Sequence, residues 1–86
     1  MAEETLRNTL KVQRAMRDLT QADLADLAGV TRRSVNAIEM GHMVPSILLS
    51  LKLARALGVA VDELFRLDGQ PAADGPPEPV RWRRSE

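Results

Sequence analysis

The sequence predicts an all-α fold of five short helices, followed by a C-terminal tail rich in proline and glycine. Its 86 residues are 44% hydrophobic, which is enough to build the core of one small domain. Apolar residues recur at helical spacing between residues that commonly begin or end a helix. No region is rich in strand patterns and no internal repeat is visible, so the expected fold class is all-α.

The first helix is expected before residue 20, and two apolar stripes compete for its buried side. Leu6, Leu10 and Arg14 lie on one side of such a helix. The rival stripe consists of Val12, Met16 and Leu19. The pattern therefore predicts the helix and leaves its rotation open.

The second helix has clear signals at both ends. The segment Thr20-Gln21-Ala22-Asp23 has the form of a capping box, in which a hydroxyl and a carboxylate each accept from a free main-chain N–H. Leu19 and Leu24 occupy the positions of the hydrophobic contact that often accompanies such a cap. Gly29 suits the left-handed conformation that ends many helices. We therefore expect a helix from Gln21 to about Ala28.

The third helix repeats these signals after a short turn. Thr31 is its candidate N-cap, and Val30 and Val35 form the accompanying apolar contact. Val35 and Ile38 give the helix one apolar face before Gly41. A second short helix is therefore expected directly after the first turn.

Two further helices follow. Pro45-Ser46 begins an apolar segment that Gly58 closes. Within it, the residues at roughly helical spacing are Ile47, Leu49, Leu53, Ala54 and Leu57. A last short helix is expected over Val61–Arg66, with Leu64 and Phe65 as its apolar residues.

The composition changes at residue 67, because prolines and glycines beyond it break any regular element. We expect a domain over residues 1–66 and a tail over residues 67–86 that is flexible or ordered by a partner. The tail contains Val80-Arg81-Trp82-Arg83-Arg84. This alternation suits an edge strand, a phosphate contact or simple solvation, and solvation is the favoured interpretation.

The charges are unevenly placed, although 12 Lys and Arg balance 12 Asp and Glu. Between Leu27 and Val61 the one acidic residue is Glu39. The basic residues of that stretch are Arg32, Arg33, Lys52 and Arg55. A polyanion can approach it without strong repulsion. Charge alone favours a solubilising role, so the positions of these residues must decide.

Composition also argues against several classes of function. The chain has no cysteine, and the single histidine, His42, cannot supply the several ligands of a zinc site, so no metal or other cofactor is expected. No glycine loop for phosphate and no nucleophile beside a base is visible, so no enzyme is expected. Charged residues interrupt the longest apolar stretch, Ile47–Val61, which argues against a membrane segment and favours the cytoplasm.

The spacings of helices two and three are those of a tight helix-turn-helix. Ala25 is the small residue where the helices cross, Gly29 forms the turn, and Val35 and Ile38 pack inward. Across Asn8–Phe65 the chain resembles the Cro and phage-repressor type (XRE-type) of helix-turn-helix regulator. The segments that carry the resemblance are Leu19-Thr20-Gln21-Ala22-Asp23-Leu24-Ala25, Gly29-Val30-Thr31-Arg32 and Ser34-Val35-Asn36-Ala37-Ile38-Glu39.

This resemblance implies a repressor-like domain whose third helix enters the major groove of DNA. With the apolar pair of that helix in the core, the outward side chains are Arg33, Asn36, Ala37 and Met40. Arg33 suits guanine O6 and N7, Asn36 suits adenine N6 and N7, and Ala37 suits a thymine methyl group. Arg32 lies on the shoulder, where a base contact and a phosphate contact are equally supported.

The resemblance also assigns residues at the helix ends. Gln21 is implied as a phosphate contact, and main-chain amides at a helix N-terminus attract anions. Thr31 and Ser34 each suit a cap, a phosphate contact or both, with Thr31 expected mainly as a cap. Glu39 is implied to pair with Arg14 and so to hold helix one against helix three.

The chain departs from the family pattern at several positions. Gln13 stands where an aliphatic residue is usual, and Asp18 stands where glycine is common. Leu48 and Leu51 extend the apolar surface of the fourth helix. The candidate dimer contacts are Leu48, Leu51, Leu64, Phe65 and Trp82. For the leucines and Phe65, burial in the core of the single chain is nearly as good an explanation.

The predicted function is a sequence-specific DNA-binding transcriptional regulator, expected to act as a repressor. It would bind double-stranded DNA as a homodimer on an inverted repeat with half-sites about 34 Å apart, and so join the nucleoid. The alternative is an antitoxin that binds its own operator while its tail folds on a toxin. Co-purification of a partner through residues 70–86 would favour that alternative.

Overall fold

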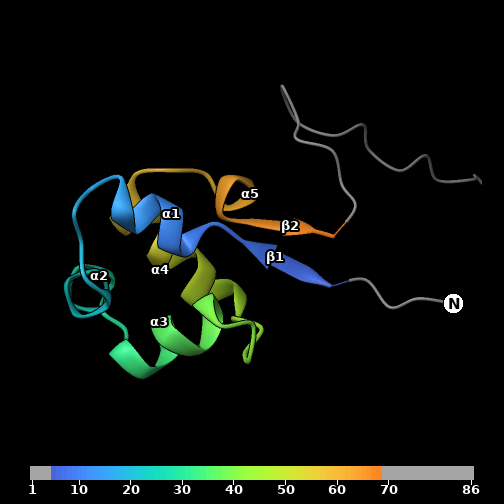
Figure 1. Ribbon diagram of the computed structural model, residues 1–86, viewed down its shortest axis with the longest axis horizontal. Helices are drawn as coiled ribbons and strands as arrows, with labels where there is room; N and C mark the ends of the chain where they lie inside the picture. Colours follow the sequence, from blue (N-terminus) through green and yellow to red (C-terminus); the bar gives the residue numbers. More distant parts are fainter. Residues whose placement is uncertain (1–4, 69–86) are drawn as a thin grey trace, which may run out of the picture.

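Five helices and two short strands make up the described part of the chain (Figure 1). The computed structural model describes residues 5–68. The elements in chain order are β1 (Leu6–Asn8), α1 (Leu10–Ala15), α2 (Gln21–Ala28), α3 (Arg32–Glu39), α4 (Ile47–Leu57), α5 (Val61–Leu64) and β2 (Phe65–Leu67). The predicted five-helix architecture is confirmed, with a strand pair added to it.

All five helices contribute to one aliphatic core. Its largest fully buried side chains are Leu10, Leu24, Val35, Ile38, Leu53 and Leu64. Burial of one such side chain stabilises the fold by about 1.5–3 kcal/mol. The core fixes the rotation of α3, because Val35 and Ile38 must both point into it.

The predicted helix boundaries of α2 are confirmed. Thr20 Oγ1 accepts a hydrogen bond from the Asp23 N–H at 3.0 Å, and Asp23 Oδ2 accepts one from the Thr20 N–H at 3.0 Å. Gly29 ends the helix at φ 71°, in the left-handed region. These contacts fix both ends of α2.

The helices α3 and α4 also begin as predicted. Thr31 Oγ1 accepts from the Ser34 N–H at 3.1 Å, and Ser46 Oγ accepts from the Leu49 N–H at 3.1 Å. A hydroxyl acceptor at this position satisfies a main-chain N–H that has no partner inside the helix. Both predicted N-cap residues therefore make the hydrogen bond that begins their helix.

The structure settles the rotation of α1. Leu10 is fully buried, whereas the side chains of Val12 and Met16 are 58% and 70% exposed. The side that carries Leu10 and Arg14 therefore faces the protein. Leu6, predicted to share that helical side, lies instead in β1.

The strand pair corrects two predicted helix boundaries. The first helix begins at Leu10, and the last helix ends at Leu64 instead of Arg66. Residues 6–8 and 65–67 pair as antiparallel strands, with Arg7 opposite Arg66. The pair lies at the end of the molecule opposite α2 (Figure 1). Three residues are too few for an alternating pattern to identify a strand.

After α1, Asp18 adopts the left-handed conformation that glycine adopts after α2, α3 and α4. Its φ is 54°, in the left-handed region. The Leu19 N–H donates to the Arg14 carbonyl at 3.0 Å, and the Asp18 N–H donates to that of Ala15 at 3.1 Å. This is the bonding pattern of a helix that ends on a left-handed residue.

Substitution of Asp18 should report the cost of that conformation. Asp18→Gly is expected to be more stable to unfolding than Asp18→Val by about 2 kcal/mol, because a β-branched residue is strained at positive φ. Urea unfolding of both variants would measure the difference. Equal midpoints would show that the turn at Asp18 relaxes without cost.

Candidate nucleic-acid interface

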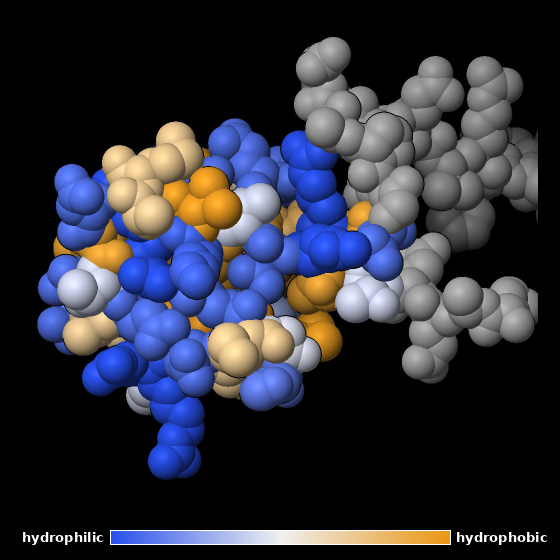
Figure 2. Space-filling view, in the orientation of Figure 1, coloured by the Kyte–Doolittle hydropathy of each residue, from blue (hydrophilic) through white to orange (hydrophobic). Residues whose placement is uncertain are grey.

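The surface of α3 presents a polar face to solvent. Arg32, Arg33, Asn36 and Met40 are exposed, and Ala37 is half-buried. Strongly hydrophilic side chains project from the lower edge of the molecule, where α3 lies (Figure 2). The helix therefore carries donors outward while its opposite face fills the core.

The first turn of α3 is organised by two hydroxyl groups. Thr31 Oγ1 accepts from the Ser34 N–H and donates to Ser34 Oγ at 2.9 Å. Thr31 thus acts as the N-cap, in the role expected of it. Because Ser34 Oγ is the acceptor in this bond, its own hydroxyl hydrogen can donate to an outside acceptor.

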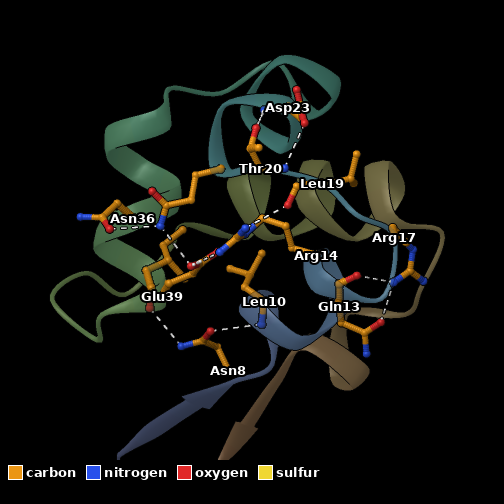
Figure 3. A network of polar contacts seen from close by, with 12 residues as sticks. Asn8, Leu10, Gln13, Arg14, Arg17, Leu19, Thr20, Asp23, Asn36 and Glu39 are labelled. Carbon is orange, nitrogen blue, oxygen red and sulfur yellow. Dashed lines mark hydrogen bonds and ion pairs between the residues drawn. The ribbon is translucent and has the colours of Figure 1, made fainter.

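An ion pair joins α1 to α3. Arg14 Nε donates to Glu39 Oε2 at 2.9 Å, and Arg14 Nη2 donates to Glu39 Oε1 at 3.1 Å. The Arg14 and Glu39 side chains are 17% and 5% exposed. Arg14 Nη1 also donates to the Leu19 carbonyl at 2.9 Å, so the guanidinium lies between α3 and the start of α2 (Figure 3). The pair implied by the family resemblance is present.

The charges of this pair are mutually stabilised. Burial raises the pKa of Glu39, but hydrogen bonds from Arg14 and Gln21, with the positive charges of Arg14 and Lys11, lower it further than burial raises it. The hydrogen bond to Glu39 raises the pKa of Arg14 against the opposing effect of burial. Glu39 therefore stays ionised, and its charge is balanced within the protein.

This lowered pKa gives a testable dependence of stability on pH. A carboxylate whose folded pKa lies below its unfolded value stabilises the fold above that unfolded value, about 4.3, and the contribution is lost as pH falls through the folded pKa. Glu39→Gln should therefore be less stable than wild type at pH 7, and the difference should narrow as pH falls towards 3. Urea unfolding across this range measures it. Parallel curves would show that Glu39 contributes no proton-linked stability.

Asp23 does not interfere with that comparison. Hydrogen bonds from the main chain and the side chain of Thr20 lower the pKa of Asp23 as well. Asp23 therefore also contributes stability that is lost as pH falls, but wild type and Glu39→Gln both keep this residue. A difference in stability between the two proteins that narrows as pH falls is therefore due to Glu39.

Gln21 has a different set of contacts from the one expected. Its Nε2 donates to Glu39 Oε1 at 3.1 Å and to Asn36 Oδ1 at 3.1 Å. A primary amide has two N–H donors, so both are used inside the protein. A phosphate contact by Gln21 must then come from its main-chain N–H. The sequence spacing does not reveal this arrangement, because it depends on how α2 crosses α3.

An open hollow lies beside the N-terminus of α2. It is lined by Arg14, Thr20, Gln21, Ala22 and Arg32. Within residues 5–68 the main-chain N–H groups of Gln21 and Ala22 have no hydrogen-bond partner. The lining residues thus include two with free main-chain donors and the cationic Arg32, and both features favour an anion.

The candidate dimer contacts differ in their exposure. Leu48 and Leu51 are 64% and 54% exposed on α4. Val44 and Ile47, which were not predicted as dimer contacts, are exposed as well. Phe65 is half-buried against the core. Leu64 is fully buried in the core of the single chain, so its prediction as a dimer contact is wrong. Trp82 lies outside the described residues.

Other kinds of site receive no support from the described part of the chain. Residues 5–68 hold no group of acidic or histidine side chains placed to bind a metal ion, and His42 is exposed. No helix over this range is both long and apolar enough to cross a membrane. The tail segment that was predicted to bind a protein partner, residues 70–86, lies outside the described residues.

Sequence comparison links the chain to DNA-binding regulators. The helix-turn-helix family matches residues 10–64. An uncharacterized HTH-type transcriptional regulator of Methanocaldococcus jannaschii is 43% identical over 60 residues, which cover 70% of this chain and 91% of the relative. The HTH-type regulator YgzD of Bacillus subtilis is 40% identical over 63 residues, covering 73% and 96% of the two chains.

Solved structures give the same result. The restriction-modification controller protein C.AhdI from Aeromonas hydrophila matches with a TM-score of 0.61 and 37% identity, over 63% of this chain and 82% of that chain. The hypothetical transcription factor NHTF from Neisseria matches with a TM-score of 0.61 and 29% identity, over 64% and 63% of the two chains.

Proposed function

This chain belongs to the helix-turn-helix family of XRE-type transcriptional regulators, and on that premise we propose that it is a dimeric repressor that reads an inverted repeat. The observation that carries the proposal is the two-sided α3, whose Val35 and Ile38 are buried while Arg33 and Asn36 are exposed. A helix of this kind fits the major groove of B-DNA.

The base contacts are assigned to the outward face of α3. Arg33 donates in bidentate fashion to guanine O6 and N7, a contact that discriminates by about 1–3 kcal/mol. Asn36 meets a base edge through its amide, and Ala37 and Met40 offer apolar contacts to a thymine methyl group. Glu39 is the one acidic residue of α3, and Arg14 balances its charge.

The phosphate contacts are assigned to the helix N-termini. The main-chain N–H of Gln21 at the start of α2 and the guanidinium of Arg32 line one hollow, so we assign both to the same backbone phosphate. Ser34 and Thr31 lie on the first turn of α3, where the Ser34 hydroxyl can donate to a neighbouring phosphate. These contacts fix the position of α3 in the groove.

The dimer is assigned to the exposed apolar side of α4. Leu48 and Leu51, with Ile47 and Val44 beside them, form an apolar surface that a second copy would cover. Phe65, which is half-buried against the core, is kept as a further candidate contact. One domain offers about 600–1,000 Å² of interface to DNA, so two domains on half-sites about 34 Å apart supply the specificity that one lacks.

The dependence on salt should distinguish the two roles of arginine. Binding to a selected duplex should weaken linearly on a log-log scale, with a slope of about −0.9 per neutralised phosphate. Arg32→Ala should reduce the magnitude of that slope by about 1 per subunit and weaken binding to all sequences alike. Titrations at several salt concentrations measure both. An unchanged slope with a relaxed base preference would move Arg32 to the bases.

Selection of bound duplexes from a random pool tests the function itself. The proposal predicts a consensus with two inverted halves whose centres lie one helical turn apart. A pool that shows no enriched sequence would contradict sequence-specific regulation. Enrichment of a single half-site would still support sequence-specific DNA binding, but it would contradict the dimer.

A further inference from the structure

We propose that Gln21 is a positioning residue that fixes the orientation of the Asn36 amide and so sets which base edge α3 recognises. This inference rests on the proposed function, because it concerns how the same α3 surface reads DNA. It assigns the Gln21 side chain to specificity and not to the phosphate backbone.

Glu39 determines which end of the Gln21 side-chain amide faces it. Its Oε1 lies 3.1 Å from the Gln21 side-chain nitrogen and also accepts from Arg14 Nη2. An ionised carboxylate is only an acceptor, so Gln21 must turn its NH₂ group towards it. A hydrogen bond to a charged acceptor is stronger than one between neutral groups. The ionised state of Glu39 therefore fixes the orientation of the Gln21 amide.

The orientation is passed on to α3. The second N–H of Gln21 Nε2 points to the side-chain oxygen of Asn36 at 3.1 Å. If the Asn36 amide were turned over, two NH₂ groups would face each other without an acceptor between them. Asn36 Oδ1 therefore points inward and Nδ2 points away from Gln21. Asn36 itself is exposed, so Nδ2 is presented to the solvent on the polar face of α3.

The chemistry at the groove follows from this orientation. A fixed Asn36 Nδ2 is a donor, and it recognises a base edge that offers an acceptor, such as purine N7, guanine O6 or thymine O4. Without Gln21 the amide can present either its oxygen or its nitrogen, which suits donor and acceptor edges alike. The ion pair of Arg14 and Glu39 is thus connected to base recognition through one intervening side chain.

The role of Gln21 in specificity differs measurably from a phosphate role. Gln21→Met keeps the length of the side chain and removes both donors. It should relax the preference at one base pair per half-site, by at least about fivefold, and this should be the base pair that Asn36→Ala also relaxes. The affinity for a scrambled duplex of equal length should not change.

The experiment compares four proteins on the duplex that the wild type selects, its single-base variants and the scrambled duplex. They are wild type, Gln21→Met, Asn36→Ala and the double variant, in which Gln21→Met should have no further effect on base preference. Gln13→Met is the matched control, because it makes the same exchange at a glutamine that contacts Arg17 and lies away from α3. It should leave base preference unchanged.

The outcomes separate this inference from the proposed function. A uniform loss of affinity for every duplex with Gln21→Met, at unchanged base preference, would overturn the inference and return the side chain to the phosphate. A wild-type protein that selects no sequence would overturn the proposed function and, with it, this inference.

A second variant keeps the test decisive if Gln21→Met does not fold. Asn36→Asp retains the inward acceptor for Gln21 and replaces the outward donor with an acceptor. The preferred base pair at that position should change to one that offers an amino group there. An unchanged preference with Asn36→Asp would contradict the fixed orientation.

Discussion

Arg14→Ala is expected to lower the free energy of unfolding by about 3 kcal/mol. The change removes the partner of a carboxylate that is 5% exposed, and a buried charge left alone destabilises far more than the intact pair stabilises. It also leaves the Leu19 carbonyl without the donor that Arg14 Nη1 supplies. Thermal and urea unfolding measure the loss.

Arg17→Ala is the matched control for this variant. Arg17 lies two residues after the end of α1, and its guanidinium donates to the main-chain and side-chain oxygens of Gln13. It contacts no carboxylate in any described contact, so its loss should cost less than about 1 kcal/mol. Equal stability of the two alanine variants would show that the pair with Glu39 does not hold α1 to α3.

Arg33→Ala is expected to weaken binding to the selected duplex by about 1–3 kcal/mol and to relax the preference for guanine at one position per half-site. The side chain is exposed and makes no described contact that supports the fold, so unfolding should not change. Titration against the consensus duplex and its base variants measures the effect.

Arg33→Lys separates charge from recognition at this position. Lysine keeps the positive charge but lacks the planar pair of donors that matches guanine O6 and N7. It should restore part of the affinity for all sequences without restoring the preference for guanine. If Arg33→Ala leaves the preference for guanine unchanged and lysine restores the affinity for all sequences, the contact of Arg33 is to phosphate.

The helix boundaries were predictable where a local signal decides them. The cap at Thr20, the cap at Thr31 and the left-handed Gly29 depend on contacts within a few residues, and each is found where the sequence predicts it. The strands β1 and β2 were not predictable, because their partners are about 60 residues apart in sequence and each strand is only three residues long. This pairing draws Leu6 out of the first helix.

The buried and exposed faces of α3 were predictable from the sequence, but the hydrogen bonds within the candidate site were not. Helical spacing alone places Val35 and Ile38 inward and Arg33 outward, because one contact with the core fixes the rotation of the helix. Spacing does not allocate the two N–H donors of Gln21, which depend on the distance between α2 and α3. It also could not separate Leu64, which is buried, from Leu48, which is exposed, because both are apolar residues at helical spacing.

The central claim is that the polar face of α3 is the surface that contacts DNA. Amide chemical-shift mapping of the labelled protein with the selected duplex tests it most directly. We expect the largest changes on residues 31–40 and on the first turn of α2, with smaller changes at Leu48 and Leu51. Large changes confined to α4, with α3 unaffected, would contradict it.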